Sequence, residues 1–396
     1  MPGYVLVWFL FVFAWITNYL IRMGFAALLP PIMADLGLSY TGAGVLASAF
    51  FVAYLVVQLP AGLLGDRFGR RRVLIGGLLA GALASVSTGF AVSFLTLLAA
   101  RVFTGASQGC LFSNDRAIIV SVTPPEKIGV GQAVSFLGPG LGITLGLVLG
   151  GLLGEALPWR TVFFVFALPP IVAALLVHRF VPAPPPVNVS SLGVQFWRVL
   201  RQSDVWLLGL SAAAVMWVQY VIATWAPLLF MEAGVAELSR AGFYASLQGL
   251  AGVGGLLAGG WLTDRAHRSG VGRKAVLAGS LAALTAAAMA LALVIQRGPS
   301  VPVLAGALLL VAFCAWGVWG PSFAVLGEVV TGAELSTAFG LYNSVCVVGA
   351  VISPGLTGWT RDLTGSFVAG AYLCAAVALA GALATLPIRP RAPVGA

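Results

Sequence analysis

The sequence predicts an all-α membrane protein with twelve transmembrane helices. Of its 396 residues, 60% are hydrophobic and only 8% are charged, whereas soluble domains have about 45–50% apolar and about 25% charged residues. Because each spanning helix needs about 20 residues, twelve spans leave little chain for an extramembrane domain. The composition therefore excludes a soluble enzyme, a disordered protein and a nucleic-acid-binding protein.

Apolar runs between charged or Pro/Gly-rich breaks define the expected spans. The twelve runs cover residues 4–29, 40–64, 73–91, 93–114, 129–153, 161–181, 205–230, 241–262, 275–296, 301–327, 336–360 and 366–387. A proline-rich polar stretch divides them six and six. We therefore expect an N-terminal six-helix bundle over 1–181, a cytoplasmic linker over 182–204 and a C-terminal six-helix bundle over 205–396.

Basic residues predict the topology. Most of the 21 lysines and arginines, including the cluster Arg70 to Arg72, fall on one side of the spans if the N-terminus is cytoplasmic. Because cytoplasmic loops of membrane proteins are enriched in Lys and Arg, we expect a multi-pass protein of the plasma membrane with both termini in the cytoplasm. The net charge of +9 is then mostly a topology signal.

A short glycine- and charge-containing motif occurs once in each half of the chain. It reads Gly62-x3-Asp66-Arg67-x-Gly69-Arg70 after the second span and Gly260-x3-Asp264-Arg265 after the eighth. A carboxylate at such a helix end can cap a neighbouring helix or pair with an arginine of the other half, so we predict a gating role for these residues. The alternative for Arg70, Arg71 and Arg72 is that they only anchor the topology.

These loops resemble the signature loop of the major facilitator superfamily, and the resemblance covers the whole chain. It implies two parallel six-helix repeats that alternate access to a central site, a monomer, and no cofactor. Three shorter stretches resemble the anion:cation symporter branch, which moves organic and inorganic anions. They are Asn18-Tyr19-Leu20-Ile21-Arg22, Arg101-x3-Gly105-x2-Gln108-Gly109 and Gln58-Leu59-Pro60-Ala61-Gly62.

The chain departs from that branch at two positions. Ile21 and Gln108 stand where the branch usually has aspartate and glutamate, the carboxylates thought to carry protons. A proton as coupling ion is therefore left open. The sequence fits a uniporter, an anion exchanger, or a symporter that takes its proton on the substrate or on a carboxylate at a span end, namely Asp35, Asp115 or Glu328.

Arg22 and Arg101 lie well inside their expected spans, each about 12 Å from the outer end. A charge in mid-membrane costs about 2.5–3.5 kcal/mol on insertion scales, so both are functional candidates. By the expected boundaries, all 12 acidic residues fall in loops or at span ends, which favours a bound anion as the counter-charge. Alternatively, Arg22 reaches the interface and Arg101 ties helix ends together through carbonyls.

Other polar residues complete the expected substrate site. Asn18 shares a helix face with Arg22, and Gln108 shares one with Arg101, so both can donate hydrogen bonds to the anion. In the second half, three candidates for the opposite wall lie well inside their spans: Tyr220, Gln248 and Asn343.

A glycine ladder in the fifth span has two interpretations. Its members recur every four residues: Gly138, Gly142, Gly146, Gly150 and Gly154. Stripes of small residues let helices approach closely, so we expect a packing face. Gly138-Pro139 also resembles the antiporter motif of drug exporters, and this supports a rival function.

We predict a secondary transporter of a small organic anion, with the anion and the lipid bilayer as its partners. Neither a catalytic triad, a P-loop nor a Cys/His cluster occurs within reach of a common site, so we expect no enzyme activity and no metal. The first rival is a drug exporter, against which the lack of intramembrane carboxylates argues. The second is a receptor that senses a solute without moving it, for which the short loops offer no output surface.

Overall fold

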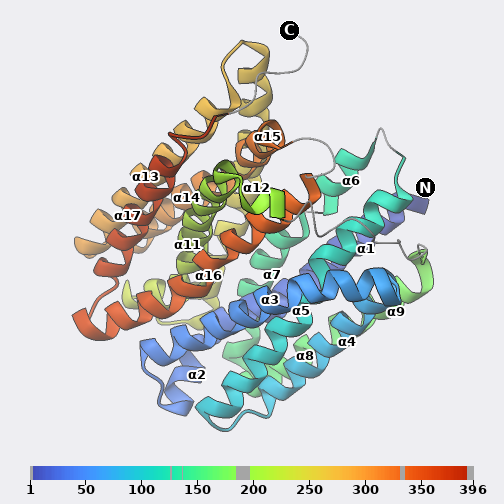
Figure 1. The fold of residues 1–396 in the computed structure, drawn as a ribbon. Helices are drawn as coiled ribbons and strands as arrows, with labels where there is room; N and C mark the ends of the chain where they lie inside the picture. The colour runs from blue at the N-terminus through green and yellow to red at the C-terminus, as the bar shows by residue number, and fades with distance from the viewer. Residues whose placement is uncertain (1–2, 125–126, 136, 184–196, 331–334, 390–396) are drawn as a thin grey trace. The chain divides into compact units, whose positions relative to one another are not determined.

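The computed structural model describes residues 3–124, 127–135, 137–183, 197–330 and 335–389, and all regular elements in these ranges are helices (Figure 1). Within them, 11 helical segments are long and apolar enough to cross a membrane, and Val368–Ala384 is a shorter apolar helix. The all-α multi-pass fold class is thereby confirmed. Most of the expected linker, residues 184–196, lies outside the described residues.

The chain forms two compact units. Unit 1 is Met1–Val189 with Val235–Gly249, and unit 2 is Ser190–Gly234 with Leu250–Ala396. Unit 1 contains nine helices of the described chain: α1 (Gly3–Ala27), α2 (Leu29–Leu36), α3 (Tyr40–Phe68), α4 (Arg70–Gly89), α5 (Phe94–Val122), α6 (Ile128–Ser135), α7 (Leu137–Ala156), α8 (Trp159–Phe166) and α9 (Leu168–Phe180). It also includes the first part of α12 (Leu238–Arg268).

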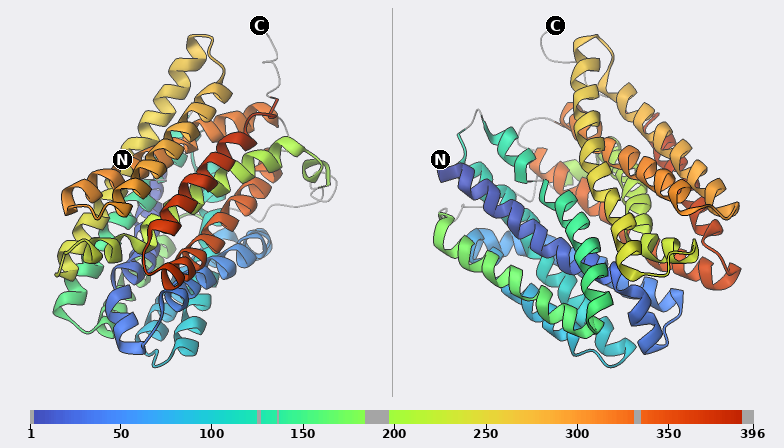
Figure 2. Two further views of the ribbon diagram at one scale, coloured as in Figure 1. Left: turned by 90° about the vertical axis from the view of Figure 1, so that its left-hand side faces the viewer. Right: turned by 180° about the vertical axis from the view of Figure 1, so that it is seen from behind.

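Unit 2 contains the remaining helices, which Figure 2 shows from two further sides. They are α11 (Ser203–Glu232), the rest of α12, α13 (Arg273–Gln296), α14 (Val301–Gly317), α15 (Trp319–Val329), α16 (Leu335–Thr364) and α17 (Val368–Ala384). Helix α11 packs extensively against α16, and α13 packs extensively against α17. In Figure 1, α13 and α17 run side by side.

Local sequence sets several helix ends in unit 1. The Gly42 N–H donates to Ser39 Oγ at 3.1 Å, which caps the start of α3. Ser93 and Thr96 form a capping box at the start of α5. Prolines occupy the first turn of α9, directly after α8 ends. The expected span 161–181 therefore consists of two helices.

The glycine ladder of α7 packs against α1. A Cβ added at any of four glycines would lie 2.5–2.8 Å from the Cβ of an α1 residue, closer than real Cβ atoms approach. The pairs advance together along both helices: Gly138 with Trp15, Gly142 with Tyr19, Gly146 with Met23 and Gly150 with Ala27. The packing interpretation is confirmed, and this contact fixes the helix that bears Arg22.

Gly142→Ala is expected to destabilise the protein. The new methyl group would lie 2.5 Å from Tyr19 Cβ, and overpacking of this kind costs about 1–3 kcal/mol. The matched control is Gly76→Ala on α4, where nothing lies within 4 Å of the added Cβ, so its apparent melting temperature should stay the same or rise. Thermal unfolding in detergent measures both. Equal melting of Gly142→Ala and wild type would contradict close α1–α7 packing.

A basic residue after each motif loop donates to main-chain carbonyls at or just beyond the C-terminal end of the last helix in its half of the chain. In unit 1, Arg71 Nη1 donates to the carbonyl of Val181 at 2.9 Å. In unit 2, Lys274 Nζ donates to the carbonyls of Leu386 at 2.6 Å and Ile388 at 2.7 Å. Arg71 also donates to the carbonyl of His178 within α9, and cations stabilise helix C-termini by satisfying their last carbonyls. Arg71 therefore does more than anchor the topology, and the two halves share this contact as well as the motif.

Candidate substrate-binding site

Arg22 of α1 lies against Gln108 of α5. Its Nε and Nη2 donate to Gln108 Oε1 at 3.2 and 3.0 Å. Gln108 Nε2 in turn donates to the main-chain carbonyl of Asn18 at 2.9 Å. The side chains of Arg22 and Gln108 are almost fully buried, with 5% and 1% of their surface exposed. Asn18 enters this cluster through its main chain, whereas the sequence analysis expected its side chain to donate to the anion.

Aromatic rings surround the guanidinium of Arg22. Its Cζ lies 4.4 Å from the ring centroid of Tyr19 and 4.5 Å from that of Phe50. The rings of Tyr54 and Phe51 are 5.3 and 5.7 Å away. Cations within about 6 Å of a ring face are attracted by its quadrupole. These rings hold the cation in an apolar environment without supplying a full negative charge.

Arg101 of α5 contacts the same aromatic group. Its Cζ is 4.1 Å from the Phe25 centroid and 4.9 Å from the Phe50 centroid, and its Nε donates to the carbonyl of Leu46 at 3.4 Å. The guanidinium carbons of Arg22 and Arg101 both face Phe50, so they are no farther apart than the sum of their two distances from that ring. The fold thus brings together two cations.

Within the described ranges, no carboxylate forms an ion pair with Arg101. Like charges in an apolar environment repel each other strongly. A bound anion between or beside the two guanidiniums would relieve that repulsion, and a planar fork of donors suits carboxylate and sulfonate oxygens. The site is therefore electrostatically suited to an anion.

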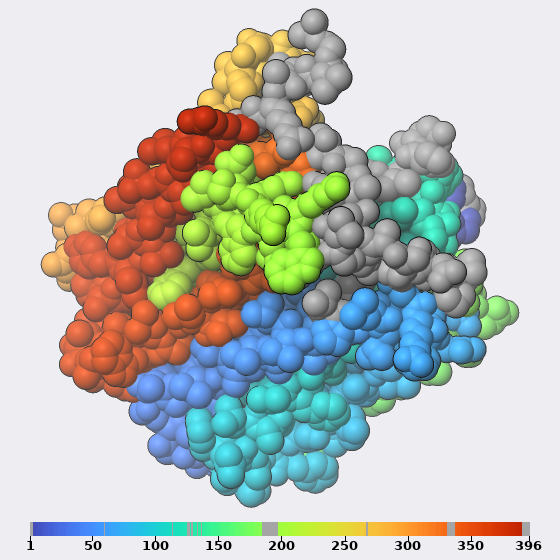
Figure 3. All heavy atoms as spheres, viewed as in Figure 1, coloured from blue at the N-terminus to red at the C-terminus, as the bar shows by residue number. Residues whose placement is uncertain are grey.

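Glycines on α5 set this geometry. A Cβ on Gly105 would overlap the main-chain carbonyl of Phe50, and one on Gly109 would lie 2.9 Å from the carbonyl of Tyr54. Helix α3 can therefore approach α5 closely enough to place Phe50 and Tyr54 beside the arginines. On the face drawn in Figure 3, side chains fill the spaces between the blue and cyan helices of unit 1.

The three site candidates from the second half of the sequence lie on other helices than Arg22 and Arg101. Tyr220 and Asn343 lie in unit 2, on α11 and α16, two helices that pack against each other. Gln248 lies in the α12 segment assigned to unit 1, where its Nε2 donates to the carbonyl of Ala245 one turn earlier. Their role in substrate binding stays a prediction.

The first motif loop forms an ion pair at the junction of α3 and α4. Arg70 Nε and Nη2 lie 2.9 and 2.8 Å from Asp66 Oδ1. Gly69 separates the helices with a φ of 98°, a conformation that favours glycine. Arg67 lies over the ring of Phe68, and Gly62 is half-buried on α3. Asp66 therefore has a partner within its own unit, which makes Arg70 more than a topology anchor.

The second motif loop differs from the first. Arg265 lies over the Trp261 ring at 5.5 Å, and both Asp264 and Arg265 are exposed. Gly260 lies against Gly320 of α15, where an added Cβ on Gly320 would meet the Gly260 nitrogen at 2.9 Å. The ion pair at this end of unit 2 joins Arg273 and Glu328 at 3.1 Å. The gating role of both loops stays a prediction.

The prediction that Asp115 lies at a span end is wrong. The expected span ended at residue 114, but α5 continues to Val122 and Asp115 is fully buried within it. Its Oδ2 accepts from Trp15 Nε1 at 2.7 Å and lies 3.1 Å from Arg116 Nη2. Not every carboxylate therefore lies outside the spans. The repeat of aromatic and polar residues along α1 and α5 could have indicated this contact.

The family of the chain follows from comparison with known proteins. The model of the Major Facilitator Superfamily matches residues 8–295. The chain belongs to this family. It is therefore a multi-pass membrane transporter and not an enzyme. A solved bacterial homologue of the human lysosomal transporter Spinster has the same fold, with a TM-score of 0.83 and 18% identity over 100% of both chains.

Two transporters are similar to this chain over most of their length. The hexuronate transporter of Bacillus subtilis is 26% identical over 95% of this chain and 90% of its own. A probable sulfoacetate transporter of Cupriavidus necator is 29% identical over 94% of this chain and 90% of its own. The names of both relatives specify small organic anions.

Proposed function

We propose that this protein is a secondary transporter of a small organic anion and that Arg22 and Arg101 bind the anion. The observation that carries the proposal is the pair of buried guanidiniums that share the Phe50 ring. The two relatives that transport a hexuronate and a sulfonate support an organic anion as substrate. Gln108 orients Arg22, since it is the acceptor for two of its N–H groups.

Access to the site requires movement. Both arginines are at most 5% exposed, and rings of Tyr19, Phe25 and Phe50 lie over them. An anion reaches the guanidiniums when helices or rings move, and alternating access supplies such a movement. We propose that the charged residues of the motif loops, Asp66, Arg70, Asp264 and Arg265, bias that exchange between states, and the ion pair of Asp66 with Arg70 supports this role for the first loop.

The distribution of charge supports the topology. We propose that the transporter lies in the plasma membrane with both termini in the cytoplasm, because this topology puts most basic residues inside. The resemblance to its family supports a monomer. The drug-efflux alternative has less support, since the buried charges beside Phe50 are cations and would repel a lipophilic cation.

A counterflow experiment tests the proposed function. Proteoliposomes that contain the purified protein are loaded with one unlabelled anion, and entry of the same labelled anion is followed. Glucuronate, galactarate, sulfoacetate and, as an inorganic comparison, nitrate are tested in turn. We expect saturable exchange of at least one organic anion. Movement of lipophilic cations with no exchange of any anion would overturn the proposal and favour the exporter.

A further inference from the structure

Helices α1 and α5 are joined by polar contacts at regular intervals. Arg22 contacts Gln108, Trp15 contacts Asp115 at 2.7 Å, and the Trp8 Nε1 donates to Thr123 Oγ1 at 2.9 Å. The three α1 residues are seven positions apart, so they share one helix face at steps of about 10.5 Å. The Trp15–Asp115 contact is therefore the next one along the seam from the contact at the anion site.

Asp115 is a buried carboxylate with one incompletely satisfied oxygen. The side chain is fully buried, and its Oδ1 has no hydrogen-bond partner among the residues that the structure describes. The other oxygen, Oδ2, receives both the indole N–H of Trp15 and the guanidinium of Arg116. A buried charge is costly unless it is paired and hydrogen-bonded. The site thus has room for a proton on Oδ1.

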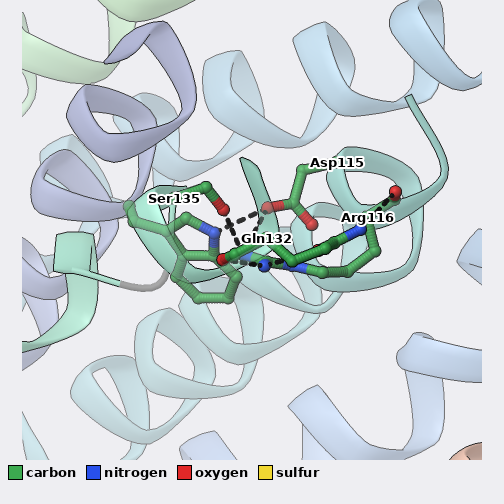
Figure 4. A network of polar contacts seen from close by, with 5 residues as sticks. Asp115, Arg116, Gln132 and Ser135 are labelled. Atoms are coloured by element: carbon green, nitrogen blue, oxygen red, sulfur yellow. Dashed lines mark hydrogen bonds and ion pairs between the residues drawn. The ribbon is translucent and has the colours of Figure 1, made fainter. Parts of the chain in front are cut away.

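Arg116 has neutral partners that do not depend on Asp115. Figure 4 shows its guanidinium beside Gln132 and Ser135 of α6. Arg116 Nη1 donates to Gln132 O at 3.0 Å and Gln132 Oε1 at 2.8 Å, and Nη2 donates to Ser135 Oγ at 2.5 Å. Protonation of Asp115 would leave these three bonds in place. The surroundings can therefore hold the carboxyl group both ionised and neutral.

Other charged groups lie on the helices packed against α5, and none of those in the described residues forms an ion pair with Asp115. They are Arg22 on α1, Asp66 and Arg67 on α3, and Arg70, Arg71 and Arg72 on α4, whereas the described residues of α6 include none. Asp66 pairs with Arg70, and Arg71 bonds to carbonyls of α9. Among the described residues, Arg116 is the one charged side chain in contact with Asp115.

We propose that Asp115 is the residue that binds and releases the coupling proton of transport. This inference rests on the proposed function. The proton adds to the Asp115 carboxylate from one side of the membrane and leaves to the other side, with no other bond changed. Coupling passes through α1, because Trp15 and Arg22 lie on the same face of that helix. A shift of α1 on anion binding alters both contacts together.

The test is anion accumulation driven by a pH gradient in proteoliposomes held at zero membrane potential. For electroneutral transport of one proton with a monovalent anion, each pH unit supports about tenfold accumulation, because one unit is 1.36 kcal/mol. Wild type is expected to reach this value when the outside is acidic. Asp115→Asn, which keeps the shape and an acceptor for Trp15, should exchange the anion in counterflow but show no accumulation.

The controls separate coupling from folding and from the proposed function. Glu237→Gln, at an exposed ion pair with Arg240, should accumulate the anion like wild type. Trp15→Phe removes a donor that favours the ionised carboxylate, so the pH midpoint of uptake should move to higher pH. A merely structural role for Asp115 would leave that midpoint unchanged.

Three results would overturn the inference. These are gradient-driven accumulation by Asp115→Asn equal to wild type, an unchanged pH midpoint in Trp15→Phe, and uptake by wild type without proton movement, as recorded by a pH-sensitive dye inside the vesicles. The last two do not require Asp115→Asn to fold. By contrast, absence of anion counterflow in wild type itself would refute the proposed function rather than the role of Asp115.

Discussion

Replacing Arg101 by glutamine is expected to abolish uptake of the organic anion while the amount of folded transporter stays the same. Arg101 is 2% exposed and has no carboxylate partner among the described residues. Its replacement therefore leaves none of the described carboxylates without its counter-charge, and we expect the variant to fold. Each hydrogen bond to a charged group contributes about 1.5–3 kcal/mol. Loss of a two-donor contact therefore predicts affinity weaker by about a hundredfold or more.

Two variants control this prediction. Arg101→Lys keeps the charge but not the planar fork, so it should retain part of the uptake. Arg297→Gln removes an arginine that is exposed at the end of α13 and should leave uptake unchanged. Uptake by proteoliposomes and the monodisperse fraction in size-exclusion chromatography are the two measurements. A folded Arg101→Gln protein with normal uptake would contradict the role of this residue.

Replacing Gln108 by glutamate is expected to make anion binding strongly dependent on pH. The new carboxylate would lie about where Gln108 Oε1 now sits, 3.0 Å from Arg22 Nη2. When ionised, it competes with the substrate for Arg22; when protonated, it does not. Anion affinity should therefore fall as pH rises through the ionisation of this glutamate, by about tenfold or more if one charge-assisted contact is lost.

The measurement is the concentration of anion that half-saturates a fluorescence or thermal response at each pH. Gln296→Glu is the matched control, because it makes the same change at an exposed position at the end of α13. It should follow the pH dependence of wild type. If Gln108→Glu and Gln296→Glu gave the same affinity at every pH, the anion would not use the face of Arg22 that contacts Gln108.

Hydropathy was sufficient to predict the fold class but not the helix boundaries. Long apolar runs identify spanning segments because each must satisfy its backbone polar groups internally. They do not show where a run breaks, as between α8 and α9 at Ala167 or between α14 and α15 at Val318. The prolines after Ala167 keep a helical φ at the start of α9, so the hydropathy profile continues through the break.

The charged and polar residues of the site were predictable from the sequence, whereas its aromatic residues were not. Arg22, Arg101 and Gln108 are polar within apolar runs, so they are visible in the sequence. Phe50 and Tyr19 count as ordinary apolar residues there, and only tertiary packing places them beside a guanidinium. The sequence shows the spacing of Gly105 and Gly109 on α5 but not their role. The fold shows that they let α3 pack closely against α5.

Asp115 shows why charge is an unreliable sign of a span end. Because ionisable groups are costly within a membrane, the apolar run predicts that the span ends just before this residue. In the fold, α6 supplies Gln132 and Ser135 to Arg116, and α1 supplies Trp15 to Asp115. The charges are satisfied by side chains from other helices, and α5 continues for two further turns.

A ligand panel on purified protein tests the central claim most directly. Thermal unfolding in detergent is recorded with hexuronates, aldarates, sulfonates, short monocarboxylates, inorganic anions and lipophilic cations, for wild type, Arg101→Gln and Arg297→Gln. A ligand that binds only the folded state raises its apparent stability. We expect one class of organic anion to stabilise wild type and Arg297→Gln but not Arg101→Gln. Stabilisation by lipophilic cations alone, equal in all three proteins, would contradict the account.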